Sequence, residues 1–255
     1  MKTHNGPPPP RQTLRLDLGH VHVFYQATDA VDEAAAFALL SRDERLRHSQ
    51  FVFDRDRRDY AAAHALLRWS LSRYAPVAPE AWQFRNGPNG KPLIAGDYGV
   101  LPLAFNLSHT HGLVACAIAV HADVGVDVES VTRAVDEGVS RRFFAATEQA
   151  EIGRAATPRE RAERFFELWT LKEAYIKAIG LGLLHPLSTI VFEVGVDRSI
   201  AFTAPADVDP ARWRFVVFAP REDHRLAVAA RAAQGTLSTI TVFAGDRQQM
   251  VFDLR

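Results

Sequence analysis

The stretch that most constrains the fold is a helix predicted between Thr157 and Gly180. Thr157-Pro158-Arg159-Glu160 matches a capping box with proline at the first helical position. Gly180 and Gly182 supply a residue that can close a helix in the left-handed conformation. Apolar residues recur between these ends at helical spacing and predict a buried stripe, namely Phe165, Leu168, Trp169, Ile176 and Ile179.

A carboxylate on this helix faces the predicted buried side. Glu173 lies four residues after Trp169 and three before Ile176, so its side chain points toward the apolar stripe. A buried carboxylate needs a partner. The partner is either Lys177, one turn further on, or a metal ion. A surface ion pair at this spacing contributes only about 0.2–0.5 kcal/mol.

Composition and charge exclude several classes of protein. The 255 residues suffice for one large domain or two small ones, and the 47% hydrophobic and 24% charged residues are ordinary for a globular protein. Thirty basic residues balance thirty acidic ones, so bulk charge predicts neither a nucleic-acid nor a membrane partner.

The cysteine content and the N-terminal residues predict a cytoplasmic protein. Cys116 is the single cysteine, lies in an apolar run and cannot form an internal disulfide, which fits a reducing compartment. Residues 1–10 predict a disordered, proline-rich tail in place of a signal peptide. No apolar run approaches the roughly 20 residues of a membrane span.

Alternating helical and strand patterns predict an α+β fold. Helices are expected at 29–40, 42–51, 54–74 and 139–152, and strands at 14–23 with a break near Gly19, then at 190–196, 213–219, 226–231 and 236–243. The apolar run 113–120 and residues 124–129 are expected to form a hairpin. We predict two similar α+β halves, residues 11–123 and 124–255, with the C-terminal strands forming a mainly antiparallel sheet.

Two carboxylates alternate with valines in Val124 to Glu129. Side chains alternate along a strand, so Asp127 and Glu129 share one face and can converge on a hard cation such as Mg²⁺. An exposed polar face of an edge strand is the alternative. Gly125 favours the first interpretation slightly, because glycine weakens a strand unless another backbone approaches closely.

Several basic and hydroxyl residues are candidate phosphate ligands. Lys172 and Lys177 flank Glu173, and Lys91 ends the turn-rich loop 85–92. The arginine cluster around Arg47 is interleaved with acidic residues, as on a solvated helix face. Ser108-His109 fits a phosphate contact, a turn with a satisfied histidine, or a hydrolase pair with Asp127, although the serine lacks the glycine-flanked elbow of such enzymes.

The order and spacing of these motifs are similar to those of the 4′-phosphopantetheinyl transferase superfamily. The resemblance is carried by three segments, 105–109 (FNLSH), 124–129 (VGVDVE) and 169–180 (WTLKEAYIKAIG), and by Gly90-Lys91-Pro92, Arg142-Phe143-Phe144 and Glu148. The chain resembles the long, surfactin-synthetase-activating type, and the resemblance runs from about Ser41 to Phe192. It implies a pseudo-dimer of two α+β halves in one chain, with the active site between them.

The resemblance also implies an activity and a set of site residues. The expected reaction transfers the phosphopantetheine arm of coenzyme A to a serine of an apo acyl or peptidyl carrier protein, releasing adenosine 3′,5′-bisphosphate. Asp127, Glu129 and Glu173 would hold Mg²⁺, with Mn²⁺ as an alternative, and Glu173 is the candidate base. Lys177 would contact the pyrophosphate. Arg47, Lys91, Ser108, His109 and Lys172 complete the expected coenzyme A set.

Two rival hypotheses remain at this point. The same fold could serve as a non-catalytic module that binds coenzyme A or a carrier protein, or Ser108 and His109 could serve a hydrolase. The intact set of Asp127, Glu129, Glu173 and Lys177 argues against the module. The expected state is a monomer.

Overall fold

Two main sheets organise the chain. The computed structural model describes residues 14–99, 102–135, 137–180, 187–233, 235–245 and 247–254. One sheet has five strands in the order β12-β11-β1-β5-β4, and the other has three in the order β6-β10-β9. The hairpins β2-β3 and β7-β8 form two small sheets. The predicted tail, residues 1–10, and Gly182 lie outside the described residues.

The bounds of the elements are as follows. The helices are α1 (Glu33–Ala38), α2 (Arg42–Ser49), α3 (Asp54–Leu71), α4 (Glu137–Phe143), α5 (Ala146–Gly153) and α6 (Pro158–Ile179). The strands are β1 (His20–Ala27), β2 (Phe84–Asn86), β3 (Pro92–Ile94), β4 (Leu103–Thr110), β5 (Leu113–Val120), β6 (Ala122–Ser130), β7 (Val191–Val194), β8 (Ile200–Thr203), β9 (Trp213–Phe218), β10 (His224–Ala232), β11 (Thr239–Ala244) and β12 (Arg247–Asp253).

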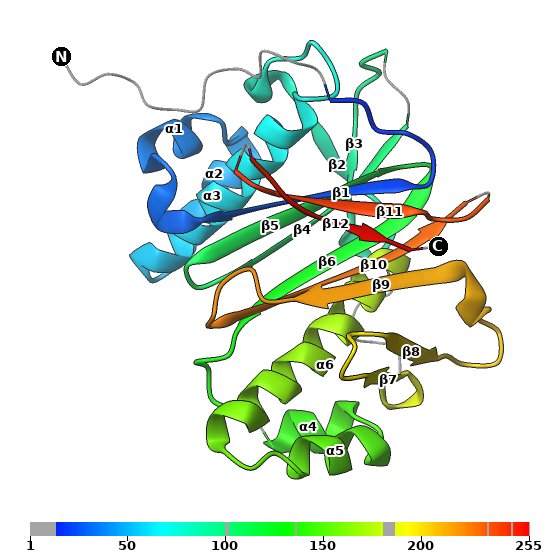
Figure 1. Cartoon of the computed structure of the whole chain (residues 1–255). Helices are drawn as coiled ribbons and strands as arrows, with labels where there is room; N and C mark the ends of the chain where they lie inside the picture. The colour runs from blue at the N-terminus through cyan, green and yellow to red at the C-terminus, as the bar shows by residue number, and fades with distance from the viewer. Residues whose placement is uncertain are drawn as a thin grey trace.

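The elements stack as helix, sheet, sheet and helix (Figure 1). α3 covers the outer face of the five-stranded sheet, where Leu67 packs with Phe24 of β1. The two sheets face each other over a valine- and alanine-rich core that joins Val23 of β1 to Val126 of β6. α6 covers the far face of the three-stranded sheet, where Leu171 shares a cluster with Ala227 of β10. This layering confirms the predicted α+β class.

The run 113–120 is buried along its whole length, as predicted. As β5 it lies between β1 and β4, and both of its faces are covered. Alternate side chains therefore enter the two different cores, and Cys116 is buried on the α3 side. A strand covered on both faces has no polar side, which explains its uninterrupted apolar sequence.

The predicted hairpin between residues 113–120 and 124–129 is wrong. β5 pairs with β1 and β4, whereas β6 begins the three-stranded sheet and pairs with β10. His121 lies between them with φ of 47°, and the chain passes there from one sheet to the other. The short connection suggested a hairpin, but the packing of the two sheets determines the pairing.

The last two strands return to the first sheet. β11 pairs parallel with β1, with His20 opposite Thr239, and β12 pairs antiparallel with β11. Strands of both predicted halves therefore share one sheet. The division into residues 11–123 and 124–255 stays a proposal.

Other element predictions need correction. The strand predicted at 14–23 begins only at His20, because Gly19 forms a turn with φ of 81°. The helix predicted at 29–40 is shortened to α1, which is capped by Asp32. α3 ends at Leu71, three residues before the predicted end, and the helix predicted at 139–152 is two helices, α4 and α5. The C-terminal strands belong to three sheets, and β8 and β12 were not predicted.

The predicted ends of α6 are confirmed. Thr157 Oγ1 accepts a hydrogen bond from Glu160 N at 3.1 Å, and Gly180 closes the helix with φ of 70°. Glu160 accepts from Ala156 N, one residue before the position of a full capping box. In the stripe, Phe165, Leu168 and Ile176 are buried, and Trp169 and Ile179 are half-buried against the same core.

Candidate functional site

The site lies where α6 crosses β6, and Gly125 permits the close approach. A Cβ atom at Gly125 would lie 2.0 Å from Ala174 O and 2.5 Å from Ala178 N, both in the backbone of α6. No side chain fits there, so the glycine is required by packing. The contact places the polar face of β6 against the C-terminal half of α6.

Three carboxylates near this crossing influence one another electrostatically. Asp127 is buried, while Glu129 and Glu173 are half-buried. Burial and the charge of Asp127 raise the pKa of Glu173 to about 7, and the charge of Lys177 opposes this shift. Burial and Asp127 likewise raise the pKa of Glu129, against the effect of its ion pair with Arg133. The alternative of an exposed edge-strand face is therefore wrong for Asp127.

Lys177 pairs with Asp127, not with Glu173. Its Nζ lies 2.6 Å from Asp127 Oδ1 and 2.9 Å from Ser108 Oγ. The simple pair along the helix surface, left open by the sequence, is thus replaced by a contact between α6 and β6. Lys177 bears the positive charge nearest to the buried carboxylate.

The carboxylates keep oxygen atoms that fit a cation. Among the described residues, Asp127 Oδ2 and Glu173 Oε1 are buried and have no hydrogen-bond partner. Such atoms are costly unless a ligand satisfies them. In the same ranges, no three His, Cys, Asp or Glu side chains are already gathered closely enough to hold a metal ion. The oxygen donor set suits Mg²⁺ or Mn²⁺, and Lys177 lies beside it.

Ser108 and His109 point to opposite sides of β4, because neighbouring side chains alternate along a strand. The Ser108 hydroxyl donates to Asp127 Oδ1 at 2.9 Å. His109 is exposed on the other side, and partial desolvation and the charge of Lys177 lower its pKa. The alternative of a hydrolase pair is wrong, since a nucleophilic serine would donate to the histidine.

Lys91 forms a hydrogen bond to the backbone at the end of α6. Its Nζ donates to Ala178 O at 2.8 Å and to Val124 O at 3.3 Å, and burial lowers its pKa. Asn89 from the same loop donates to Gly180 O at 2.8 Å. These donors satisfy carbonyl groups that the last helical turn leaves free. In this structure, the predicted phosphate ligand joins the loop to the helix that carries Glu173.

Lys172 lies away from the carboxylate cluster, which corrects the expectation that it contacts coenzyme A. Its side chain is 0% exposed, and its Nζ lies 2.8 Å from Glu148 Oε2 and 2.9 Å from Leu187 O. Glu148 is 1% exposed and also accepts from Phe192 N. This buried pair ties α5, α6 and the start of β7 together. We therefore withdraw Lys172 from the proposed binding set.

A groove of about 1020 Å³ opens on the α3 side of the first sheet. Arg47 of α2 lines it, together with Phe84, Gly90 and Leu107. Its wall includes a partly buried polar network, in which Glu44 binds Arg68 at 2.7 Å and His64 at 2.8 Å. Arg47 itself is exposed and donates to Gln50. Leu107 and His109 share one face of β4, so the groove and the exposed histidine lie on the same side.

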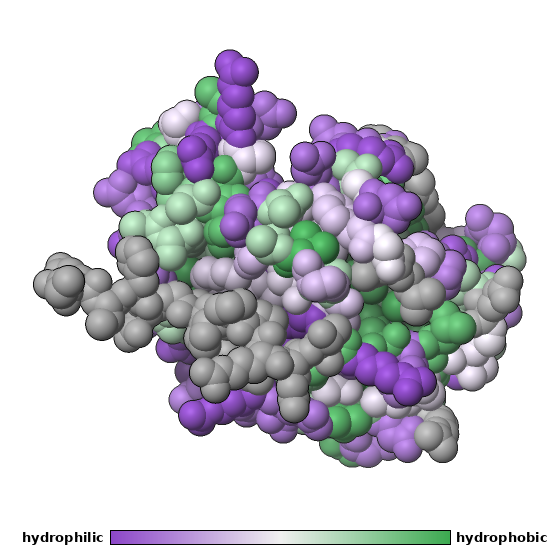
Figure 2. Space-filling view, turned by 90° about the horizontal axis from the view of Figure 1, so that it is seen from above, coloured by the Kyte–Doolittle hydropathy of each residue, from purple (hydrophilic) through white to green (hydrophobic). Residues whose placement is uncertain are grey.

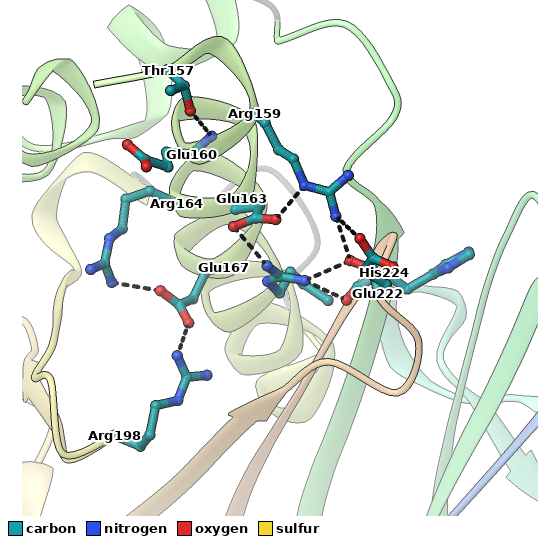
Figure 3. A network of polar contacts seen from close by, with 10 residues as sticks. Thr157, Arg159, Glu160, Glu163, Arg164, Glu167, Arg198, Glu222 and His224 are labelled. Atoms are coloured by element: carbon teal, nitrogen blue, oxygen red, sulfur yellow. Dashed lines mark hydrogen bonds and ion pairs between the residues drawn. The ribbon is translucent and has the colours of Figure 1, made fainter. Parts of the chain in front are cut away.

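The first half of α6 carries a separate ion-pair network (Figure 3). Glu163 binds Arg159 at 3.0 Å and Arg225 at 3.3 Å, and Glu167 binds Arg164 and Arg198. Arginine and glutamate side chains alternate around a hollow of about 630 Å³. These charges neutralise one another and anchor α6 to the second sheet.

Figure 2 shows the molecule from above, relative to the view of Figure 1. On this face, hydrophilic and hydrophobic residues are interspersed.

Three polar residues beside the carboxylates had no predicted role. Asn106 accepts from Val126 N at 2.9 Å, Thr110 donates to Glu129 Oε2 at 3.1 Å, and Arg133 pairs with Glu129. Asn106, Ser108 and Thr110 alternate along β4, and this period of two is the signal that predicts a shared polar face. The motif 105–109 stopped one residue short of Thr110.

Two family models match the chain in succession. Residues 29–121 match the N-terminal domain of 4′-phosphopantetheinyl transferases, and residues 123–229 match the 4′-phosphopantetheinyl transferase superfamily. The chain belongs to this superfamily, and its length and the two consecutive matches are those of the long type. The predicted resemblance is confirmed.

Particular relatives agree with this assignment. The chain is 32% identical over 232 residues to the 4′-phosphopantetheinyl transferase HetI of Nostoc sp., covering 90% of this chain and 94% of the relative. It is 28% identical over 174 residues to the 4′-phosphopantetheinyl transferase Sfp of Bacillus subtilis, covering 68% of this chain and 75% of the relative.

Solved structures match a smaller part of the chain. The holo-[acyl-carrier-protein] synthase of Neisseria meningitidis is 20% identical with a TM-score of 0.35, over 43% of this chain and 96% of that one.

None of the helices in the described ranges is long and apolar enough to cross a membrane.

Proposed function

We propose that this chain transfers the 4′-phosphopantetheine arm of coenzyme A to a serine of an apo acyl or peptidyl carrier protein, releasing adenosine 3′,5′-bisphosphate. The family assignment supports the reaction class. The observation that carries the proposal for the site is the group formed by Asp127, Glu129, Glu173 and Lys177 where α6 crosses β6. Transfer between phosphate esters needs mainly positioning and charge neutralisation, and this group supplies both.

The carboxylates are the proposed metal ligands. Asp127, Glu129 and Glu173 would hold Mg²⁺, or Mn²⁺, through their oxygen atoms, and the two unpartnered oxygens support this role. When bound, the cation would neutralise charge on the pyrophosphate of coenzyme A.

Glu173 and Lys177 carry the proposed chemistry. Glu173 accepts the proton of the incoming serine hydroxyl. Burial and the charge of Asp127 raise its pKa to about 7 in the protein without a metal ion, and a bound cation would favour the ionised form that can accept the proton. The serine oxygen forms a bond to the phosphorus of the pantetheine arm, and the bond to the nucleotide phosphate breaks. Lys177 moves from Asp127 to the pyrophosphate and stabilises the negative charge of the leaving group.

The nucleotide end of coenzyme A is assigned to the groove lined by Arg47. Arg47, which lines this groove with Gly90, is one proposed contact with the 3′-phosphoadenosine. His109 is the other, because it is exposed on the face of β4 that Leu107 shares. Lys91 Nζ uses two of its three N–H donors for the carbonyl groups of Ala178 and Val124, so it can contact a phosphate oxygen through the third. We propose that it does so when the nucleotide is bound.

The remaining proposals concern assembly. We propose that residues 11–123 and 124–255 are the two halves of one monomeric, cytoplasmic enzyme, with the active site between them. The balanced net charge supports a carrier-protein partner over nucleic acid or a membrane surface.

The first experiment is the intact mass of an apo carrier protein after incubation with this chain, coenzyme A and Mg²⁺. We expect a mass gain of one phosphopantetheine arm, which a chelator abolishes. Glu173→Gln should lose at least about 100-fold in rate, because the base and a metal oxygen are removed together.

Glu163→Gln is the matched control for this experiment. Glu163 lies on the same helix but pairs outward with Arg159 and Arg225, so its variant should keep the rate. If wild type binds coenzyme A but leaves several unrelated carriers unmodified, the chain is a binding module. If it neither transfers nor binds coenzyme A, the proposed site is wrong.

A further inference from the structure

The loop between β2 and β3 connects the nucleotide groove to α6. The pairing of the two strands leaves residues 87–91 as the loop. Gly90 lines the groove that is assigned to the nucleotide. Lys91, the next residue, donates to the backbone of α6. The loop therefore lies between the proposed nucleotide site and the helix that carries Glu173.

The loop turns sharply at Asn89 and Gly90. Both residues have a left-handed backbone, with φ of 55° and 79°. Asparagine and glycine adopt this conformation more readily than other residues, and two of them in succession reverse the chain. Gly87 N donates to Lys91 O at 2.8 Å and closes the turn. The loop thus has a defined shape, from which the side chains of Asn89 and Lys91 extend.

These two side chains attach the loop to the helix at two points. Asn89 Nδ2 donates to Gly180 O at 2.8 Å. Lys91 Nζ donates to Ala178 O, also at 2.8 Å. The last turn of a helix leaves such carbonyl groups free, so each bond satisfies an acceptor. The stem of Lys91 passes close to Gly180, where a Cβ atom would lie 3.5 Å from Lys91 Cδ. A loop held at two points has less freedom to rotate than a loop held at one.

The two side chains differ in what they can still bind. A lysine ammonium group has three donors. Lys91 uses two of them for Ala178 O and Val124 O and keeps the third for a phosphate oxygen. The Asn89 amide is neutral and donates to the helix, so it acts on a ligand through the position of the loop. Loss of its bond would free the loop and displace the third donor of Lys91.

We propose that Asn89 is a positioning residue, which holds the loop 87–91 on α6 and thereby directs Lys91 at the 3′-phosphate of coenzyme A. The proposal rests on the proposed function, in which Lys91 contacts the nucleotide end. Because Asn89 acts through Lys91, its loss should weaken the binding of coenzyme A and leave the binding of 3′-dephospho-coenzyme A unchanged.

The test measures the Kd of the whole chain for these two ligands by calorimetry in the presence of a chelator. Wild type should bind coenzyme A at least about tenfold more tightly than 3′-dephospho-coenzyme A, because the latter lacks the charge-assisted bond to the 3′-phosphate. Asn89→Gly tolerates the left-handed backbone and should weaken the binding of coenzyme A about three- to tenfold. Its Kd for 3′-dephospho-coenzyme A, and its kcat in carrier modification, should stay within about twofold of wild type.

Asn89→Ala separates the loss of the amide from a change in backbone freedom. Glycine gives the loop more freedom and alanine gives it less, but both remove the amide. The two variants should therefore weaken the binding of coenzyme A to a similar extent. If alanine prevents folding, because its Cβ atom disfavours the left-handed backbone, Asn89→Gly alone decides the comparison.

The matched control is Arg198→Gly. Arg198 also has a left-handed backbone, with φ of 68°, and lies between β7 and β8. Its side chain binds Glu167 at 2.6 Å, in the first half of α6. The variant therefore removes a contact between a hairpin and α6 without touching the loop 87–91. Both of its Kd values should equal those of wild type.

Each contrary result has a distinct meaning. An equal loss of affinity for both ligands in Asn89→Gly would be a general effect on the groove and would overturn the proposal. Unchanged affinities would show that Lys91 is directed without Asn89. Equal affinities of wild type for the two ligands would show that Lys91 does not read the 3′-phosphate, which also overturns it. A wild type that binds both ligands as expected but modifies no carrier would instead refute the proposed function alone.

Discussion

At the residue scale, the ammonium group of Lys177 lies beside Asp127, where a metal ion would bind. Its ammonium group lies 2.6 Å from Asp127 Oδ1, so it competes electrostatically with any metal ion that approaches Asp127. We predict that Lys177→Met binds Mn²⁺ or Mg²⁺ at least about tenfold more tightly than wild type, or ~1.4 kcal/mol. Calorimetry without coenzyme A measures this directly.

Lys91→Met serves as the control for this prediction. It also removes one positive charge near the cluster, but from the carbonyl groups of Ala178 and Val124. Its metal affinity should stay close to that of wild type. Equal affinities in all three proteins would show that Lys177 does not compete with the ion.

His22 should make stability depend on pH. It is buried in β1 beside Tyr74, and burial, with the charges of His20 and Arg73, lowers its pKa to about 4. In the unfolded chain the pKa returns to about 6.5, so the unfolded state binds more protons between these values. The contribution of His22 to stability is therefore fully present above pH 6.5 and is lost as the pH falls toward 4.

The expected loss between pH 7.5 and pH 5 is about 2 kcal/mol in the free energy of unfolding. Glu173, whose raised pKa of about 7 acts in the opposite direction over this pH range, affects wild type and His22→Gln equally. Urea unfolding at both pH values should therefore show about 2 kcal/mol more loss in wild type than in His22→Gln. His111→Gln, at a side chain that is 73% exposed, should keep the wild-type dependence. Equal losses in wild type and His22→Gln would contradict the assignment.

At the element scale, local signals predicted the elements better than their partners. The caps at Thr157 and Gly180 gave both ends of α6 because capping depends on a few neighbouring residues. The hairpin predicted after 113–120 failed because strand pairing depends on distant packing, and the partner of β6 is β10, about a hundred residues further on.

The site shows the same contrast. The period of two along a strand predicts that Asp127 and Glu129 share one face, and the resemblance alone joined Glu173 to them, so their common metal site stays a prediction. The positions of Lys91 and Lys172 could not be predicted in this way. Their nitrogen atoms bind backbone carbonyls of other elements, which no spacing in the sequence reveals.

The crossing of β6 and α6 gives the element-scale prediction. Gly125→Ala would place a Cβ atom 2.0 Å from Ala174 O, so the helix must move away from the strand. We expect a loss of about 3 kcal/mol in stability, at the upper end of overpacking effects. Carrier modification should slow as well, because the strand and the helix carry the carboxylates between them.

Gly153→Ala is the control for the crossing. No described atom lies within 4 Å of a Cβ atom built at Gly153, so its variant should change stability by less than about 0.5 kcal/mol. Urea unfolding compares the two variants. Equal stability of both would mean that the approach of α6 to β6 is not as close as described.

At the scale of the whole molecule, the proposed halves are joined in three ways. The hairpin β11–β12 completes the first sheet, the core between the sheets contains residues of both, and side chains of β4 accept backbone hydrogen bonds from β6. Separating the halves would expose the edge of β1 and an apolar sheet face. Both are unfavourable in water. We therefore predict that the chain unfolds in one cooperative transition.

Tryptophan fluorescence can test this prediction one half at a time. The double variant Trp169→Phe/Trp213→Phe keeps Trp69 and Trp82, which report on the first half, and the complementary double variant keeps the other pair. In each variant, urea unfolding followed by fluorescence and by far-UV circular dichroism should have the same midpoint. Comparing the two probes within one variant removes the effect of the substitutions on stability. Two separate midpoints in either variant would show that the halves fold independently, and the shared core would then be an interface between two domains.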